Sequence, residues 1–322
     1  MRVLIVKMSS MGDIIHALPA VSDAANALPG IQFDWVAEEA FIEIPAWHKN
    51  VNRVIPIALR RWRKRPWHAL KQEEVQQFYK QLRLQQYDKV IDAQGSIKSA
   101  VTTRLSRGSR LGMDKNSVRE TFADLAYQEK FFIPQKQHAI DRLRQLFAKA
   151  LGYPLEKIPP CYGGIARDHL TPTKLDLPPN YLVFIPNASW AAKCWPETSW
   201  SSLLERTAQQ EIFVFIPWGN QAEKERGMRI ANKHANVSVL PHLSLSELAN
   251  LLLQAKAAVC VDTGLSHLAA ALGTPAITLY GPTDPKLIGT MGPSQIHLQS
   301  TQKDKLEIPI ETVWQALQQI IS

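Results

Sequence analysis

Several features that mark common classes of protein are scarce or missing in this chain of 322 residues. It has three cysteines, an odd number without a CxxC pair, which argues against a disulfide framework or a structural zinc site and fits a reducing compartment. No apolar run approaches the roughly 20 residues that span a bilayer. The early apolar stretch Val3–Val6 is too short for a signal peptide. We therefore expect a cytoplasmic protein that at most lies against a membrane.

The common catalytic and phosphate-binding motifs are also absent. The chain contains no Walker A loop, no G-x-S-x-G turn and no H-E-x-x-H metal motif. The loop after the first predicted strand holds a single glycine, Gly12, so a GxGxxG dinucleotide site is disfavoured. No Asp-x-Asp pair is present, so a metal-bridged nucleotide-sugar site would lack its ligands. We expect bound phosphates to be neutralised by cationic side chains and a helix terminus, without metal or another cofactor.

Positive charge, by contrast, is in excess. The chain has 37 Lys and Arg against 29 Asp and Glu, a formal net charge of +8. Part of this excess forms one cluster, made of Arg60, Arg61, Arg63, Lys64 and Arg65. Such a cluster attracts nucleic acid, an anionic membrane surface or a phosphorylated ligand. Taken alone, however, a basic run of this kind favours the ordinary explanation of a solvated surface loop.

Short apolar runs alternate with amphipathic stretches along the chain. We predict strands over residues 3–6, 33–37, 53–57, 89–91, 181–185, 212–216, 237–240, 258–261 and 276–280. We predict helices over residues 14–28, 72–84, 96–105, 138–151, 197–209, 221–235, 244–255, 264–272 and 310–321. Strands that alternate with helices in this way indicate an α/β fold with mostly parallel, doubly wound sheets.

A change of composition in the middle of the chain predicts two domains. Residues 153–180 are rich in proline and contain a Gly-Gly pair, which is typical of a linker, and the strand–helix alternation restarts after them. We expect an N-terminal domain over residues 1–165, on which a C-terminal helix over residues 309–322 packs back, and a second domain over residues 166–308. Two facing Rossmann-like domains would place a ligand cleft between the carboxyl ends of their sheets.

The residues just after predicted strands are the candidates for function. In the first half, Asp13 follows the first strand within the segment Ser10-Met11-Gly12-Asp13. One explanation makes Asp13 a helix cap, a role that Asp often fills. The other makes it a carboxylate general base at the floor of the cleft. The spacing alone favours the cap.

Polar residues follow the strands of the second half as well. Ser189 and Lys193 would suit phosphate oxygens, although Lys193 would equally suit an exposed loop. Glu223 would accept hydrogen bonds from ribose hydroxyls, but taken alone it is better explained as an acidic residue in a first helical turn. The amides of Thr263 and Gly264 at a helix start would form an anion site for a diphosphate.

Taken in order, these segments resemble the ADP-heptose–lipopolysaccharide heptosyltransferases, which have two facing Rossmann-like domains of the GT-B type. The resemblance rests on Ser10–Asp13, Lys193-x-Trp195-Pro196, Trp218-Gly219 with Glu223, Asp262-Thr263-Gly264-x-x-His267 and Gly281-Pro282-Thr283-Asp284-Pro285. Residues 33–39, 60–64 and 91–95 look most like the members that add the first heptose to Kdo2-lipid A. The alternative is a member that acts one sugar later, on heptosyl-Kdo2-lipid A.

The resemblance implies an inverting transfer of L-glycero-D-manno-heptose from ADP-L-glycero-D-manno-heptose to a Kdo hydroxyl of Kdo2-lipid A, with Asp13 as the catalytic base. The first domain would bind the acceptor through Ser10, Met11, Gly12, Arg60, Arg61, Arg63, Lys64 and Arg119. The second domain would bind the donor through Ser189, Lys193, Glu223, Leu243, Asp262, Thr263, Gly264 and His267. No metal ligand is expected.

The resemblance also gives the basic cluster a purpose. It implies an enzyme peripherally attached to the cytoplasmic face of the inner membrane, where each Lys or Arg near the anionic leaflet contributes about 1 kcal/mol. A nucleic-acid-binding protein is the main alternative of another class, because Trp62 and Trp67 lie among the cations. A sugar-nucleotide sensor without turnover is a third. We expect no nucleic acid partner.

Overall fold

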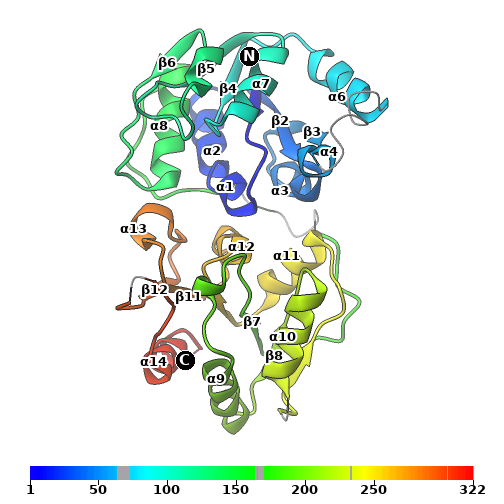
Figure 1. Cartoon of the computed structure of the whole chain (residues 1–322), viewed down its shortest axis with the longest axis vertical. Coiled ribbons are helices and arrows are strands. Elements are labelled where there is room, and N and C mark those ends of the chain that lie inside the picture. The colour runs from blue at the N-terminus through cyan, green and yellow to red at the C-terminus, as the bar shows by residue number, and fades with distance from the viewer. Residues whose placement is uncertain (64–72, 164, 166–169, 233, 303, 322) are drawn as a thin grey trace. The chain divides into compact units, whose positions relative to one another are not determined.

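The computed structural model describes residues 1–63, 73–163, 165, 170–232, 234–302 and 304–321 (Figure 1). The chain divides into two compact units, Met1–Ile165 and Ala166–Ser322. Each unit holds a six-stranded sheet, and every strand pair in both sheets is parallel. The predicted α/β class with two doubly wound, Rossmann-like sheets is therefore confirmed.

The first sheet has the strand order β3-β2-β1-β4-β5-β6. Its strands are β1 (Arg2–Val6), β2 (Gln32–Glu38), β3 (Val51–Ile57), β4 (Lys89–Asp92), β5 (Ser109–Met113) and β6 (Glu129–Phe131). Residues Val3–Val6 of the central strand β1 are fully buried. A strand that is covered on both faces needs apolar side chains at every position, which explains this continuous apolar run.

Short helices follow the strands of the first unit. They are α1 (Met11–Ile15), α2 (Leu18–Ala27), η1 (Glu39–Phe41), α3 (Glu43–Ala46), α4 (Leu59–Trp62), α6 (Glu73–Arg83), α7 (Ile97–Leu105), η2 (Ala123–Ala126) and α8 (Ala139–Leu151). The single helix predicted over residues 14–28 is in fact two, α1 and α2. Pro19 lies in the first turn of α2, where its missing N–H costs no hydrogen bond, whereas a continuous helix would lose one there.

The second sheet has the strand order β12-β11-β10-β7-β8-β9. Its strands are β7 (Tyr181–Ile185), β8 (Phe213–Ile216), β9 (Val237–Val239), β10 (Ala257–Val261), β11 (Ala276–Tyr280) and β12 (Gln295–Gln299). The helices of this unit are η4 (Ala191–Lys193), α9 (Glu197–Gln209), α10 (Gln221–Ala231), α11 (Leu245–Gln254), α12 (Gly264–Leu272), α13 (Pro285–Ile288) and α14 (Ile310–Ile321). Both central strands, β7 and β10, are buried along their whole length.

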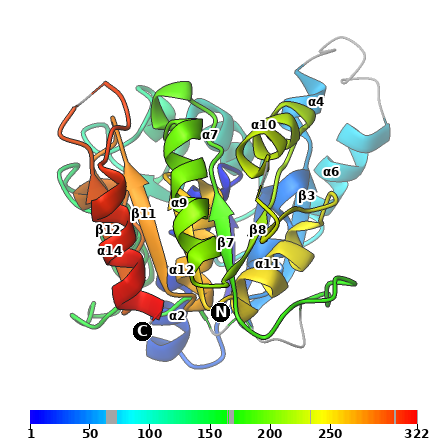
Figure 2. The same ribbon diagram turned by 90° about the horizontal axis from the view of Figure 1, so that it is seen from below.

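The C-terminal helix α14 packs differently from the prediction. It contacts α9, β10 and β11 of the second unit (Figure 2), and Val313, Trp314 and Leu317 join the core formed by the second sheet. The expected return of residues 309–322 to the first unit is therefore corrected. The helical pattern marks an apolar face, and in this fold the second sheet is the surface that this face covers.

Three strands escaped the sequence analysis. Both β6 and β12 are edge strands, and neither contains a fully buried residue. The third, β5, is interrupted by Gly112, against which the ring of Tyr127 packs. Short strands with little apolar character give a weak pattern. None of the helices in the described part of the chain is long and apolar enough to cross a membrane.

Candidate active site

Asp13 lies in the first turn of α1, and the capping residue of this helix is Ser10 rather than Asp13, so the cap expected at Asp13 is corrected to a capping box that the two residues share. The backbone N–H and the hydroxyl of Ser10 both donate to Oδ2 of Asp13, each at 2.8 Å. Oδ1 takes no part in the cap and lies 3.7 Å from Nζ of Lys7. The Asp13 side chain is 34% exposed. One carboxylate oxygen thus closes the first turn of α1, and the other takes no bond of the cap but lies beside the ammonium of Lys7.

Sequence reasoning missed Lys7, whose side chain is only 7% exposed. Burial lowers the pKa of Lys7, while the charge of Asp13 acts in the opposite direction. Burial alone would raise the pKa of Asp13, but the charge of Lys7 and the hydrogen bonds from Ser10 outweigh it and lower that pKa to about 2. Asp13 is therefore an ionised carboxylate throughout the neutral range. The available signal was a lysine directly after a buried strand.

The loop after β4 supports the same region. Oδ1 of Asp92 accepts the N–H groups of Gln94 and Gly95, both at 2.9 Å. Oε1 of Gln94 in turn accepts the N–H of Met8 at 2.8 Å, which ties this loop to the one that follows β1. The carbonyl of Gly95 accepts the N–H of Arg119 at 3.0 Å. Arg119 is thereby brought to the carboxyl edge of the first sheet, where Asp13 lies.

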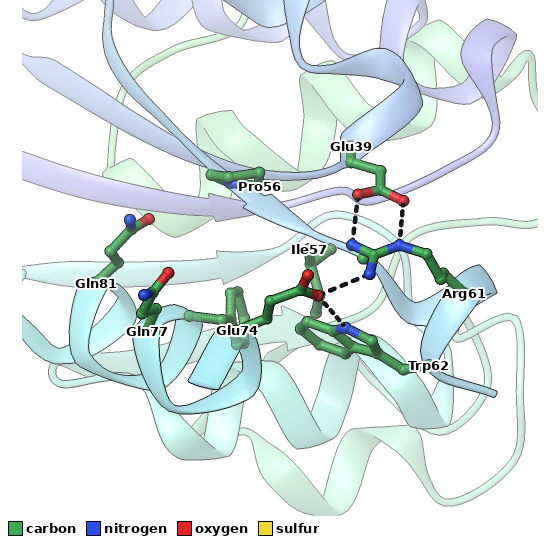
Figure 3. Close-up of a pocket in the computed structure, with 10 residues that line it drawn as sticks. Glu39, Pro56, Ile57, Arg61, Trp62, Glu74, Gln77 and Gln81 are labelled. Atoms are coloured by element: carbon green, nitrogen blue, oxygen red, sulfur yellow. Dashed lines mark hydrogen bonds and ion pairs between the residues drawn. The ribbon is translucent and has the colours of Figure 1, made fainter. Parts of the chain in front are cut away.

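Within the basic cluster, Arg61 is already paired with two carboxylates (Figure 3). Its Nε and Nη2 donate to the two oxygens of Glu39 at 3.2 and 3.0 Å, and its Nη1 donates to Glu74 at 2.8 Å. Nε1 of Trp62 shares that oxygen of Glu74 at 3.3 Å. A pocket of about 150 Å³ lies beside this network, lined further by Pro56, Ile57, Ala58, Gln77, Phe78 and Gln81. A phosphate would have to compete with Glu39 and Glu74 for Arg61.

The neighbouring cations are less constrained. The backbone N–H of Arg60 donates to Glu38 at 2.8 Å, and its guanidinium lies 5.0 Å from the centre of the Phe41 ring. Arg63 is exposed at the end of α4 and has no ion-pair partner among the described residues. Lys64 lies outside the described residues. Among the described members of the cluster, Arg60 and Arg63 are therefore the exposed cations without a carboxylate partner.

In the second unit, Lys193, Asp262 and Thr283 meet at the carboxyl edge of the sheet. Nζ of Lys193 and Oγ1 of Thr283 each lie 2.6 Å from Oδ2 of Asp262. Nε2 of His267 lies 3.9 Å from Oδ1 of the same carboxylate. Lys193, Asp262 and Thr283 follow β7, β10 and β11, and His267 lies on α12. The loop that carries Lys193 packs tightly against Gly281, since a Cβ on this glycine would lie 3.1 Å from the carbonyl oxygen of Ala192.

The N-terminus of α12 lies directly after Asp262. Thr263 is the capping residue and Gly264 is the first helical residue. The hydroxyl of Ser266 donates to the carbonyl of Thr263 at 2.7 Å. Free N–H groups at a helix start carry a partial positive charge that favours an anion. Lys193 and the first turn of α12 thus bring two kinds of positive charge to one edge.

The remaining donor candidates lie on neighbouring loops. Oε2 of Glu223 accepts the N–H of Gly219 at 2.7 Å, and Oε1 accepts the side-chain amide of Asn220 at 2.9 Å. The Glu223 side chain therefore also stabilises the N-terminus of α10. Ser189 is exposed, and Leu243 is buried just before α11. Within the described chain, no hydrogen bond or ion pair joins these three residues to Lys193 or Asp262.

The described residues contain no group of three or more His, Cys, Asp or Glu that could hold a metal ion. The carboxyl edge of the first sheet offers an ionised carboxylate, and the carboxyl edge of the second sheet offers positive charge that suits an anion. A carboxylate can accept a proton from a hydroxyl group. A lysine with helix-terminal amides can stabilise negative charge on a phosphate group.

Comparisons with known proteins place these features in context. The profile of glycosyltransferase family 9 (heptosyltransferase) matches residues 75–315. Lipopolysaccharide heptosyltransferase 1 of Pseudomonas aeruginosa is 50% identical over 301 residues, which cover 93% of this chain and 84% of that relative. The solved structure of the E. coli heptosyltransferase WaaC with ADP has a TM-score of 0.92 and 46% identity, and covers 99% of this chain and 100% of that one. WaaC with ADP-2-deoxy-2-fluoro heptose has a TM-score of 0.88 and 44% identity, with 99% of each chain covered.

Proposed function

The chain belongs to glycosyltransferase family 9, the heptosyltransferases, and from this premise we propose how its residues perform the transfer. It is a lipopolysaccharide heptosyltransferase that transfers heptose from ADP-heptose in inner-core synthesis. The family that the sequence motifs indicated is confirmed. The acceptor, the roles of the individual residues and a place of action at the cytoplasmic face of the inner membrane are our proposals.

We propose that the acceptor is Kdo2-lipid A and that the first unit binds it. The relative that is 50% identical is a heptosyltransferase 1, which supports this acceptor over the glycolipid that already carries one heptose. The acceptor carries phosphates and Kdo carboxylates, and exposed guanidinium groups suit both. Arg60, Arg63 and Arg119 are exposed cations of the first unit, so we assign the acceptor's negative charges to them.

The base in this proposal is Asp13, acting through Oδ1. Oδ2 is occupied by two hydrogen bonds from Ser10, which leaves Oδ1 to take the proton of the attacking Kdo hydroxyl. The oxygen of that hydroxyl forms the new bond to the anomeric carbon as the bond from that carbon to the diphosphate breaks, and ADP leaves with the electron pair. A single displacement of this kind inverts the anomeric centre and needs no covalent nucleophile.

The second unit stabilises the leaving group. Negative charge on ADP grows as the glycosidic bond breaks, so groups that bind it in the transition state accelerate the reaction. We assign this role to Lys193 and to the amides at the start of α12. Asp262 would hold Lys193 in place through their 2.6 Å contact, and His267 would contact the heptose or the distal phosphate. Ser189, Glu223 and Leu243 remain predicted contacts of the rest of the donor.

The substitution Asp13→Asn tests the observation that carries this proposal, a carboxylate with Oδ2 bound by Ser10 and Oδ1 outside that cap, beside Lys7. Asn has the size of Asp and keeps a side-chain oxygen that can accept the bonds from Ser10, so melting temperature and ADP binding should stay close to those of the unchanged protein. Turnover, measured as ADP release with Kdo2-lipid A, should fall by roughly 10²–10⁴-fold, the usual contribution of a positioned base. Ser10→Ala is the control, because it removes one bond of the cap and leaves the carboxylate in place.

Near-normal turnover in a folded Asp13→Asn variant that binds ADP would exclude Asp13 as the base, and His16 would be tested next. The same assay with heptosyl-Kdo2-lipid A separates the two acceptors. A preference for that longer acceptor would overturn our acceptor assignment. It would leave the assignment of the base unaffected.

A further inference from the structure

An apolar groove lies between α7 and η2 of the first unit. It has a volume of about 380 Å³ and is lined by Ile97, Ala100, Val101, Arg104, Leu105, Phe122, Ala123, Leu125 and Ala126. The exposed fractions are 71% for Phe122, 72% for Leu125 and 55% for Val101. Single exposed apolar residues are ordinary, but a contiguous apolar patch marks an interaction surface.

The backbone of η2 holds these side chains outward. Phe122 has a φ of +71°, a conformation that costs free energy for any residue with a Cβ and persists where the surroundings impose it. Asp124, two residues later, is buried and paired with Lys130 at 2.9 Å. The carbonyl of Gly95 accepts the N–H of Glu120 at 3.0 Å on the other side. Phe122 is thus fixed between two anchored points with most of its surface in water.

Cations border one end of the groove. Arg104 lines it, and Nε of Arg110 donates to the carbonyl of Ala126 at 3.1 Å. Burial and the charge of Arg104 lower the pKa of Arg110, which reflects how close the two cations are. In the part of the chain that the structure describes, neither has an ion-pair partner. The apolar patch therefore carries an uncompensated positive border at this end.

At the other end of the groove lies Ile97, the first residue of α7. The carboxylate of Glu120 accepts the backbone N–H of Ile97 at 2.9 Å. An apolar strip with cations at its border is the pattern of proteins that insert side chains into a bilayer and bind its anionic headgroups. The lining offers Arg104 as its single polar side chain, which suits acyl chains better than a protein partner.

We propose that the groove between α7 and η2 is the surface with which this protein rests on a bilayer that contains anionic phospholipids. Phe122 and Leu125 enter the acyl region, and Arg104 and Arg110 bind headgroup phosphates. The surface is made of residues other than those assigned to catalysis. Its binding is therefore measurable without substrate and independent of the proposed mechanism.

Vesicle sedimentation tests this surface. The probes are vesicles of phosphatidylcholine with 30% phosphatidylglycerol, and vesicles of phosphatidylcholine alone. The double substitution Phe122→Ser with Leu125→Ser should weaken binding to the anionic vesicles by about tenfold or more, because two apolar side chains no longer leave water. The matched control is Met228→Ser with Leu287→Ser, which removes two exposed apolar side chains of the second unit and should change binding less than twofold.

Two further variants refine the test. Phe122→Gly suits the positive φ and therefore folds, and it should weaken vesicle binding while turnover on a water-soluble, O-deacylated acceptor stays unchanged. Arg104→Gln with Arg110→Gln should abolish the preference for anionic over neutral vesicles.

Three outcomes would overturn the proposal. The first is unchanged vesicle affinity in the Phe122 and Leu125 variants. The second is a loss of self-association in analytical ultracentrifugation without a change in vesicle binding, which would assign the groove to a second copy of this chain. The third is a rise in KM for the acylated acceptor while vesicle binding stays unchanged, which would assign the groove to the acyl chains of the substrate.

Discussion

The carboxylate of Asp13 performs two tasks with two different oxygens. Oδ2 closes the first turn of α1 with Ser10, and Oδ1 lies beside the buried Lys7. The cap and the base are thus compatible explanations of one residue. A residue that is held through one oxygen is also oriented at the other, which is the kind of preorganisation that a catalytic carboxylate needs.

Lys7 should set the acid limit of activity. The pKa of Asp13 is about 2 in the folded protein against an ordinary value of 3.8. This carboxylate therefore contributes stability that is fully present above pH 4 and is lost as the pH falls toward 2. In Lys7→Met the positive charge that lowers the pKa of Asp13 is gone while burial remains, so this pKa should rise. The acid limb of kcat should therefore move to higher pH.

The measurement for Lys7 is a kcat profile from pH 4 to 8, with the exposed Lys115→Met as the control for charge. Lys115→Met should have the profile of the unchanged protein. If Lys7→Met has that same profile, Lys7 does not set the ionisation of Asp13.

Lys193 should matter more in the transition state than in the donor complex. Lys193→Met should lower kcat by roughly 10²–10³-fold, as the loss of one strong stabiliser of developing charge does, with a smaller change in the KM for ADP-heptose. It also leaves Asp262, whose side chain is 4% exposed, without its cation, so the free energy of unfolding should decrease.

Adding Asp262→Asn to Lys193→Met separates these two effects. The double variant removes the buried charge, so the thermal midpoint should recover relative to Lys193→Met. Turnover should stay low, because the leaving group still lacks its cation. Recovery of kcat together with stability would show that Lys193 has only a structural role.

At the scale of elements, the functional loops at the carboxyl edges of both sheets follow one rule. Each functional loop begins where a parallel strand ends, because the carboxyl ends of such strands meet at one edge and the next helix starts there. The loops after β1 and β4 in the first unit are joined through Gln94 and Met8. Those after β7, β10 and β11 in the second are joined through Asp262. Candidate residues far apart in sequence therefore become neighbours.

The helix α14 should be a stabilising element of the second unit. Leu317 is fully buried against the core of that unit, so Leu317→Ala should lower the free energy of unfolding by about 2–5 kcal/mol. Urea unfolding followed by tryptophan fluorescence, with and without ADP, measures this, since ADP should stabilise the unit that binds it. Leu287→Ala, at a position that is 40% exposed, should change stability by less than about 0.5 kcal/mol. If Leu317→Ala instead destabilises an unfolding transition that ADP does not shift, α14 would belong to the other unit, and this placement would be wrong.

At the scale of the whole molecule, the net charge of +8 suits an acceptor and a bilayer that are both anionic. Charges at a surface act over about 8 Å at physiological ionic strength and less at higher salt. The distribution of the cations therefore matters more than their total.

Neutralising an exposed cation of the basic cluster should weaken binding of the acceptor. Arg63→Gln should raise the KM for Kdo2-lipid A severalfold and flatten its dependence on salt, because one long-range attraction is removed. Lys256→Gln, an exposed position of the second unit, is the matched control and should leave both unchanged. Equal effects from the two variants would mean that only the total charge matters. Tight competition by single-stranded DNA through Arg63 would favour the nucleic-acid alternative.

The sequence by itself determined the fold class and the family. Uninterrupted apolar runs such as Val3–Val6 form a strand only where both faces are covered, and their alternation with amphipathic segments leaves little choice but parallel, doubly wound sheets. The segments Lys193–Pro196 and Asp262–His267 were specific enough together to indicate the heptosyltransferases. Local patterns of this kind depend on near neighbours in the chain, so they can be identified from the sequence alone.

Only the tertiary structure decided which groups meet. Lys7 pairs with Asp13, and Arg61 is bound by Glu39 and by Glu74, residues 22 and 13 positions away. No local pattern specifies such partners, because they depend on where separate loops end at the edge of a sheet. The same holds for α14: periodicity shows that it has an apolar face, but the sheet that this face covers depends on the packing of the whole unit.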